Sequence, residues 1–219
     1  SVAKILEIIK QINPSIKYFQ PCSSNMFGIS EDKTQNENTK FNPQSPYAIS
    51  KTFAYYVTRY YRESYGIHAC SGILFNHESP RRTPEYVTRK ITQSVARISL
   101  KKQDKLFLGD LSSEIDWGYS PEYMECAWRM LQSDKADDYI IASGKTHSVL
   151  DFVKEAFVQV GLDYKGYVKT DSGLLRPTKT SPLIGDISKA KKELGWSPKT
   201  TFEELVVLMV SKDIERESY

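Results

Sequence analysis

Hydrophobic positions along the chain alternate between helical spacing and short apolar runs. Isoleucines recur at helical spacing over residues 1–13, which predicts a helix that ends at Asn13-Pro14 because the residue before a proline avoids helical backbone. Residues 16–20 and 69–75 are short, mostly apolar runs, a pattern typical of buried strands. This alternation of helix and buried strand favours an α/β fold with a parallel sheet.

Capping residues mark the ends of the longer predicted helices. Ser45 and Pro46 suit the start of a helix that runs to Tyr65 and stops at Gly66. Further helices are predicted over 87–100, after Pro121, from Ser148 to Gly161, from Asp186 to Gly195, and from Thr201 onward. Strands are predicted at 106–108 and 139–142, exposed loops at 31–42 and 76–89, and core positions at Trp117, Trp128 and Trp196.

Composition limits the class of protein. With 219 residues, 40% hydrophobic and 26% charged, the chain suits one soluble domain or somewhat more. A net charge of +3 with scattered lysines gives no reason to expect nucleic acid as a partner. The three cysteines are far apart, so they are expected to be free thiols in a reducing compartment, with no metal site.

The chain offers no signal for membrane insertion. No stretch approaches the roughly 18 apolar residues that a spanning helix needs. Its first residues, Ser1 to Leu6, look like the middle of a helix rather than a signal peptide, so we expect the chain to begin inside a larger architecture. A cytoplasmic location is expected, with an organelle as the alternative if a leader has been removed.

Tyr47 and Lys51 are the strongest candidates for chemistry. Their Tyr-x-x-x-Lys spacing is that of short-chain dehydrogenases, and it places both side chains on one helix face. There, the lysine ammonium could lower the pKa of the phenol, so that a phenolate takes a proton from a sugar hydroxyl as hydride leaves. Ser23, after the preceding strand, could hold the same oxygen. The alternatives to a catalytic role are that Tyr47 is an exposed tyrosine on an ordinary amphipathic helix and that Ser23 only belongs to a turn.

A hydride needs an acceptor, normally a nicotinamide held by a glycine-rich turn between strand and helix. The chain contains no Gly-x-Gly-x-x-Gly or similar cluster.

The most specific segment of the chain is residues 72–82, which contain the run Asn-His-Glu-Ser-Pro-Arg-Arg. This segment resembles one family, GDP-mannose 4,6-dehydratase, an extended short-chain dehydrogenase. The resemblance also rests on segments 45–48, 61–66, 87–92, 116–118, 185–186 and 194–196. It covers essentially the whole chain, although the family is longer at its N-terminus.

The resemblance implies a fold and an activity. The fold would be part of a Rossmann-type parallel sheet, with the Tyr-x-x-x-Lys helix, in residues 1–75. Residues 76–219 would supply interleaved sheet pieces and a small C-terminal substrate domain. The family oxidises C4 of GDP-mannose with NADP, removes water across C5 and C6, and returns the hydride to C6. NADP would bind here only if the N-terminal half is supplied.

The resemblance also assigns roles by position. Tyr47 would be the base at O4, Lys51 would lower its pKa and touch the nicotinamide ribose, and Ser23 would replace a threonine that holds O4. His77 and Arg82 match cofactor-contacting positions. The remaining matches, which hold the GDP diphosphate and its surroundings, are Asn76, Lys90 and Arg176.

Three positions depart from the family pattern. Asn25 stands where the family has the glutamate that moves protons at C5 and C6, and a carboxamide cannot do so. Ile115 replaces an arginine that contacts the nucleotide. Lys179 replaces a glutamate that accepts the ribose hydroxyls, although lysine has no acceptor.

Two clusters remain open to more than one interpretation. The basic residues Arg81, Arg82, Arg89 and Lys90 could form a phosphate site or a solvated basic face. The aromatic run from Phe53 to Tyr61 could be packing or a binding platform. We expect it to pack in an interface, since in this fold the same helix commonly joins a four-helix dimer contact.

Three functions follow from these observations. The chain could be a GDP-mannose 4,6-dehydratase that is weak or inactive alone. It could instead be a degenerate relative that serves as a structural subunit of a larger assembly. The third option is an enzyme that only oxidises or reduces the sugar at C4. Because a shortened parallel sheet would leave an unpaired edge, we expect a homo-oligomer or a subunit covered by another polypeptide or an upstream segment.

Overall fold

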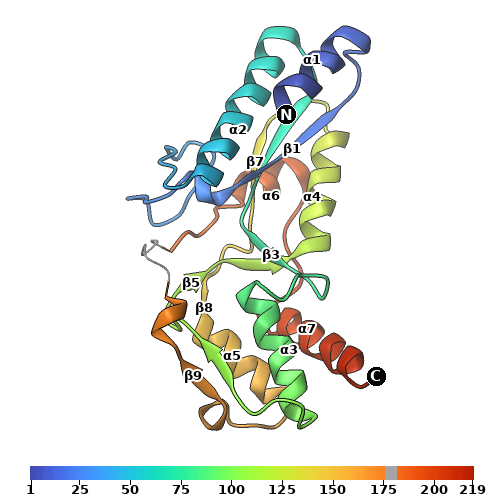
Figure 1. The fold of residues 1–219 in the computed structure, drawn as a ribbon. Helices are drawn as coiled ribbons and strands as arrows, with labels where there is room; N and C mark the ends of the chain where they lie inside the picture. Colours follow the sequence, from blue (N-terminus) through green and yellow to red (C-terminus); the bar gives the residue numbers. More distant parts are fainter. Residues whose placement is uncertain (176–181) are drawn as a thin grey trace.

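The computed structural model describes residues 1–175 and 182–219 and has a parallel sheet at its centre (Figure 1). The strands β1 (Tyr18–Ser23), β2 (Ala69–Leu74) and β7 (Asp138–Ile141) lie in the order β1-β2-β7, and both pairs are parallel. All six residues of β2 are buried, as expected for a central strand covered on both faces. The predicted α/β class with a parallel sheet is therefore confirmed.

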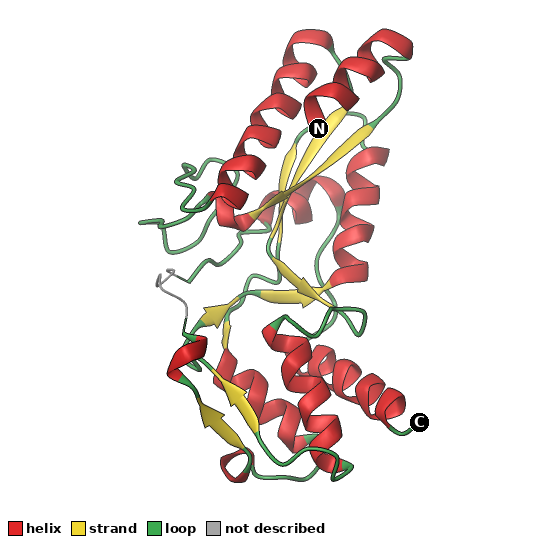
Figure 2. Ribbon diagram, in the orientation of Figure 1, coloured by secondary structure: helices red, strands yellow, loops and turns green. Residues whose placement is uncertain are grey.

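Helices cover both faces of this sheet (Figure 2). On one face, α2 (Pro46–Tyr65) packs over Cys22 and Ile73, and α1 (Val2–Ile12) lies against α2. On the other face, α4 (Ser120–Gln132) and α6 (Ser188–Leu194) pack over Cys70 and Leu74. Neighbouring residues of a strand point to opposite faces, which is why β2 contributes to both layers.

A second cluster of helices lies beyond the carboxyl end of the sheet (Figure 1). The helices α3 (Val87–Ser99), α5 (Val149–Val158) and α7 (Phe202–Glu217) share one hydrophobic core with Trp117 and with β4 (Leu106–Leu108), which pairs with β9 (Val168–Thr170). The remaining described elements are the short strands β3 (Asn76–Glu78), β5 (Glu114–Ile115), β6 (Trp117–Tyr119) and β8 (His147–Ser148), and the 3₁₀ turns η1 (Ser24–Met26), η2 (Tyr164–Gly166) and η3 (Ser172–Leu174).

Several local signals for helix ends are confirmed, but two limits were wrong: α5 ends at Val158 rather than at Gly161, and α6 begins at Ser188, after Ile187 and not after Asp186. Helix α2 has the predicted limits, with the Ser45 side chain accepting from the backbone of Ala48 and Gly66 in left-handed conformation at φ 66°. Helices α5 and α7 begin with reciprocal capping boxes, Ser148 with Asp151 and Thr201 with Glu204.

Three predicted environments were wrong. Residues 76–89 are not simply a loop, because β3 pairs with β6 there. Gln35, inside the expected exposed loop, is fully buried because its side chain and backbone bond to Ile184. Trp128 is 61% exposed on the outer side of α4 and is not a core residue.

Among the helices of the described residues, none combines the length and the apolar character that crossing a membrane requires.

Candidate active site

The first turns of α2 bring Tyr47 and Lys51 together. The Lys51 ammonium lies 5.7 Å from the centre of the Tyr47 ring, and the phenol side chain is 52% exposed. Lys51 Nζ also donates a 2.7 Å hydrogen bond to the carbonyl of Pro21 in β1. This bond ties the helix to the sheet and leaves the phenol open to a ligand.

Ser23 and Asn25 lie where β1 leaves the sheet. Ser23 is the last residue of the strand, and its hydroxyl accepts from the backbone N–H of Asn25 at 3.3 Å, which begins the turn η1. Ser23 is nearly buried, whereas Asn25 is exposed. Ser23 and Asn25 come two and four residues after Pro21, whose carbonyl accepts the hydrogen bond from Lys51.

The neighbouring strand carries Asn76 and His77 to the same edge of the sheet. Ser23 pairs with Leu74 at the end of β2, and β3 begins two residues later. Asn76 is exposed, while His77 is half-buried, with Nδ1 2.9 Å from the Phe75 carbonyl and its ring centre 5.0 Å from that of Tyr123. Burial lowers the pKa of His77, which favours the neutral imidazole.

Arg82 is held at the side of this edge by Glu78 and Tyr86. Its Nε lies 3.1 Å from Glu78 Oε2, and its guanidinium stacks 3.5 Å above the Tyr86 ring. Arg81, one residue earlier, is exposed.

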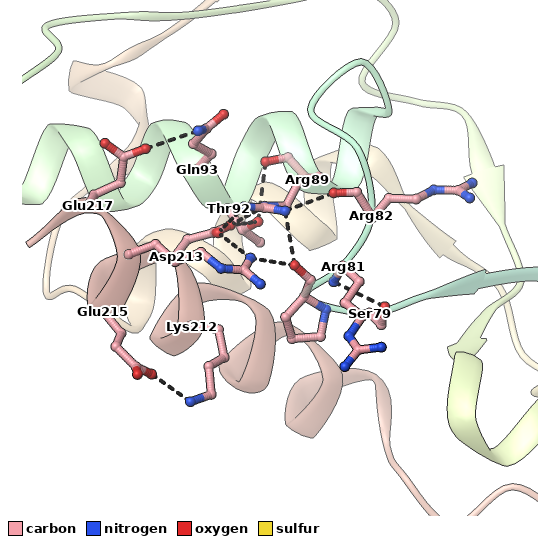
Figure 3. A network of polar contacts seen from close by, with 12 residues as sticks. Ser79, Arg81, Arg82, Arg89, Thr92, Gln93, Lys212, Asp213, Glu215 and Glu217 are labelled. Atoms are coloured by element: carbon pink, nitrogen blue, oxygen red, sulfur yellow. Dashed lines mark hydrogen bonds and ion pairs between the residues drawn. The ribbon is translucent and has the colours of Figure 1, made fainter. Parts of the chain in front are cut away.

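Arg89 lies neither in a phosphate site nor on a solvated basic face, the two interpretations offered for the basic cluster. It is 8% exposed, and its guanidinium forms a forked ion pair with the Asp213 carboxylate of α7, at 2.7 and 2.8 Å (Figure 3). Its third nitrogen donates to the carbonyls of Pro80 and Arg82 at 3.0 and 2.8 Å. Arg89 thus fixes the backbone of the loop that carries Arg81 and Arg82, and the expectation of a solvated face or a phosphate contact was wrong for this residue.

The other predicted substrate residues are placed only in part. Lys90 is half-buried in the first turn of α3, and its ammonium makes no hydrogen bond or ion pair with the described residues. Arg176 and Lys179 lie outside the described residues. Ile115 is partly buried and packs against the core of the helix cluster.

Asp116 joins the two parts of the chain behind the site. Its carboxylate, 1% exposed, accepts hydrogen bonds from the backbone and hydroxyl of Ser143 and from the backbone of Gly144 and Gly185. These donors come from the loop after β7 and from the segment before α6. The Asp-Trp-Gly segment therefore fixes the end of the sheet against the helix cluster.

Comparison with known sequences identifies the family. The family model described as "GDP-mannose 4,6 dehydratase" matches residues 1–209. The chain belongs to this family. It is 49% identical over 216 residues to GDP-mannose 4,6 dehydratase 1 of Arabidopsis thaliana and 42% identical over 231 residues to GDP-mannose 4,6 dehydratase of Dictyostelium discoideum. Each alignment covers 97% of the chain but only 60% and 65% of the relative, so this family member spans less than two thirds of their length.

Solved structures agree on the fold. The chain resembles RMD from Pseudomonas aeruginosa complexed with NADPH, with a TM-score of 0.89, 19% identity, and coverage of 98% of this chain and 72% of that one. It also resembles dTDP-glucose 4,6-dehydratase from Bacillus anthracis in complex with NAD, with a TM-score of 0.86, 23% identity, and coverage of 100% and 68%. The extended short-chain dehydrogenase fold implied by the sequence is therefore confirmed.

Sequence reasoning missed two residues near the site. Glu78 is part of the family run, and its place four residues before Arg82 is a sequence signal for an ion pair. Asp213 had no detectable signal, because its partner Arg89 is 124 residues away.

Proposed function

We propose that this chain carries the residues for hydride transfer and GDP-sugar binding of a GDP-mannose 4,6-dehydratase, and that its dehydration step is weak. The observation that supports this most is the arrangement of Tyr47 and Lys51 at the carboxyl end of β1, 5.7 Å apart and bonded to the strand that ends in Ser23. Ligands bind at this end of the strands in open α/β sheets.

Tyr47 would take the proton from the sugar hydroxyl at C4. Its phenol is exposed, so a substrate oxygen can reach it, and the Lys51 ammonium lies 5.7 Å from the centre of its ring. Ser23 Oγ, at the end of the neighbouring strand, would hold the same oxygen and orient it for proton transfer.

NADP is the cofactor that the family membership implies, and the residues at this edge fit its nicotinamide end. When bound, it would accept the hydride from C4. Tyr47 and Lys51 present a phenol and an ammonium for a ribose, while His77 and Arg82 line the following strand and loop. The neutral imidazole and the guanidinium would contact the cofactor, as in the matching family positions.

The GDP moiety would lie over β3 and the start of α3. Asn76 is exposed there, and the Lys90 ammonium is unpaired within the described residues, so it is available to a phosphate as a point charge. Arg176 is proposed as a third contact from the family match alone.

A labelled substrate tests this function. With the N-terminal half of a full-length relative added to supply the rest of the cofactor site, incubation with NADP and GDP-mannose deuterated at C4 should transfer deuterium to the cofactor. Little 6-deoxy product should form, because Asn25 cannot move protons at C5 and C6. Mass spectrometry of cofactor and sugar nucleotide measures both. The absence of deuterium transfer at saturating cofactor would contradict the proposal and favour the structural alternative.

A structural subunit is the second candidate function, and a hydrophobic stripe favours it. Ile49, Phe53, Tyr56 and Tyr60 are each more than half exposed and follow each other on one face of α2 at spacings of four and three residues. Helix α1, tied to α2 by a 2.7 Å bond between Tyr61 and Glu7, exposes Ile5, Ile8 and Ile12. A second copy of the chain is the proposed partner, as expected for the interface helix of this fold.

Charge placed in this stripe should separate the subunits. The double change Phe53→Lys and Tyr60→Lys puts two ammonium groups into the proposed interface, so the mass in solution should fall to that of one chain. Light scattering coupled to size-exclusion chromatography measures it. Trp128→Lys, at an aromatic residue on α4 that is also more than half exposed, is the control and should leave the mass unchanged. An unaltered mass in the double variant would exclude this face as the interface.

A further inference from the structure

The buried Glu78 carboxylate and the Arg82 guanidinium, whose side chain is 27% exposed, form an incomplete pair beside the proposed cofactor site. The Glu78 side chain is 3% exposed, and its Oε2 lies 3.1 Å from Arg82 Nε. Within the described residues, neither atom completes a hydrogen bond of acceptable geometry, and both are shielded from water. Glu78 is therefore a buried acid whose charge is compensated mainly by Arg82.

Arg82 is held in place, and its terminal amino groups point to no protein acceptor among the described residues. Tyr86 holds the plane of the guanidinium at 3.5 Å, and Arg89 holds the backbone carbonyl of Arg82 at 2.8 Å. Figure 3 shows the Arg82 side chain directed away from the Asp213 network. In the part of the chain that the structure describes, its terminal amino groups donate to no protein acceptor, so they remain available to a phosphate.

Among the residues that the structure describes, the other groups around Glu78 supply no second positive charge. Its register partner on β6 is Tyr119, and the nearest polar group on α3 is the buried Thr88 hydroxyl. From α4 comes the buried Tyr123, whose pKa is raised by burial and, to a smaller degree, by Glu78. His77, next in sequence, has its pKa lowered by burial and is neutral.

The ionisation of Glu78 consequently depends on whether Arg82 is free to neutralise it. Burial raises the pKa of Glu78 to about 7, against the lowering effects of the Arg82 charge and the Thr88 hydroxyl. A bound anion would draw on the charge of Arg82 and add a negative charge of its own near Glu78. Both effects favour the protonated acid.

We propose that a phosphate-bearing ligand and the Glu78 carboxylate compete for Arg82, so that Glu78 takes up a proton from solvent when the ligand binds. Glu78 is thus a positioning residue: it holds Arg82 in the empty site and gives it up, as a neutral acid, in the occupied one. The inference rests on the proposed contact between Arg82 and the cofactor, and it adds that a phosphate of the cofactor is the group contacted.

Calorimetry with inorganic pyrophosphate tests the coupling. Titrations between pH 6 and pH 9, each in two buffers of different ionisation enthalpy, give the affinity and the number of protons taken up. The wild type should take up more protons near neutral pH than Glu78→Gln, whose isosteric amide cannot titrate. The affinity of the wild type for pyrophosphate, divided by that of Glu78→Gln, should fall as the pH rises. The total fall should be about tenfold for each unit by which bound pyrophosphate raises the pKa of Glu78. The titration of pyrophosphate itself is common to both proteins and cancels.

The outcomes distinguish a failure of the proposed Arg82 contact with the cofactor from a failure of the coupling between Arg82 and Glu78. If Arg82→Gln binds pyrophosphate as well as the wild type does, or the wild type does not bind it, Arg82 is not an anion contact, and its cofactor role in the proposed function fails. If Arg82→Gln weakens binding but proton uptake is the same in wild type and Glu78→Gln, only the coupling is overturned. Should Glu78→Gln fail to fold, carbon NMR of the wild-type Glu78 carboxyl, titrated with and without pyrophosphate, must show a raised midpoint, or the inference is wrong.

Discussion

Replacing Asp213 by alanine should lower the free energy of unfolding by about 3–5 kcal/mol, the range for breaking a buried ion pair from one side. The change leaves the Arg89 guanidinium, only 10% exposed as a side chain, without its carboxylate. It also removes the acceptor of the 2.6 Å hydrogen bond from the buried Thr92 hydroxyl. Urea denaturation followed by far-UV circular dichroism measures the loss.

A control on the same helix distinguishes this network from helix effects in general. Glu215 forms a pair with Lys212, but both side chains are at least half exposed, and such pairs contribute little to stability. Glu215→Ala should therefore leave the denaturation midpoint almost unchanged. A similarly small effect of Asp213→Ala would mean that water reaches Arg89 and that the network is not a buried one.

The double change Arg89→Met and Asp213→Leu probes what the network is for. Apolar residues of similar size often replace a buried ion pair without loss, so stability should largely return. The carbonyls of Pro80 and Arg82 would still lack the donor that Arg89 provides. The double variant therefore separates overall stability from the conformation of the loop that carries Arg82, because only this loop depends on the Arg89 guanidinium as a donor.

Much of the fold could be predicted because its signals are local. The limits of α2 follow from Ser45, Pro46 and Gly66, residues that adopt their roles within one turn of the helix ends. The Tyr47 and Lys51 pair follows equally from spacing on one helix. Such features need no knowledge of the rest of the chain.

The features that escaped prediction depend on contacts between distant segments. Gln35 stands in a polar run yet is buried, because it pairs with a segment 149 residues later. Arg89 looks like one more surface cation until Asp213 arrives from the last helix. Trp128 has helical neighbours that face the sheet, but its own position on α4 points outward, which hydrophobicity alone does not reveal. Tertiary context decides each case.

Restoring a carboxylate at position 25 should recover dehydration. Asn25→Glu supplies a group able to remove and return protons at C5 and C6, and general acid–base catalysis of this kind contributes roughly 10²–10⁴-fold in rate. The position permits the change, since Asn25 is exposed in the turn η1, and only its backbone N–H is bonded to Ser23. The measurement is the rate of 6-deoxy sugar nucleotide formation from GDP-mannose, with NADP and the N-terminal half of a full-length relative present.

The matched control is Asn25→Gln, which has the same length as glutamate but cannot transfer a proton. A gain confined to the glutamate variant means that the site is complete except for its acid and base, and that the chain as it stands stops at C4. If deuterium leaves C4 while the glutamate variant still forms no 6-deoxy product, position 25 does not face C5 and C6. If neither reaction occurs, the structural alternative is favoured. Ile115, which replaces a nucleotide-contacting arginine, and the exposed stripe on α2 would then indicate a family member whose role is to bind other subunits.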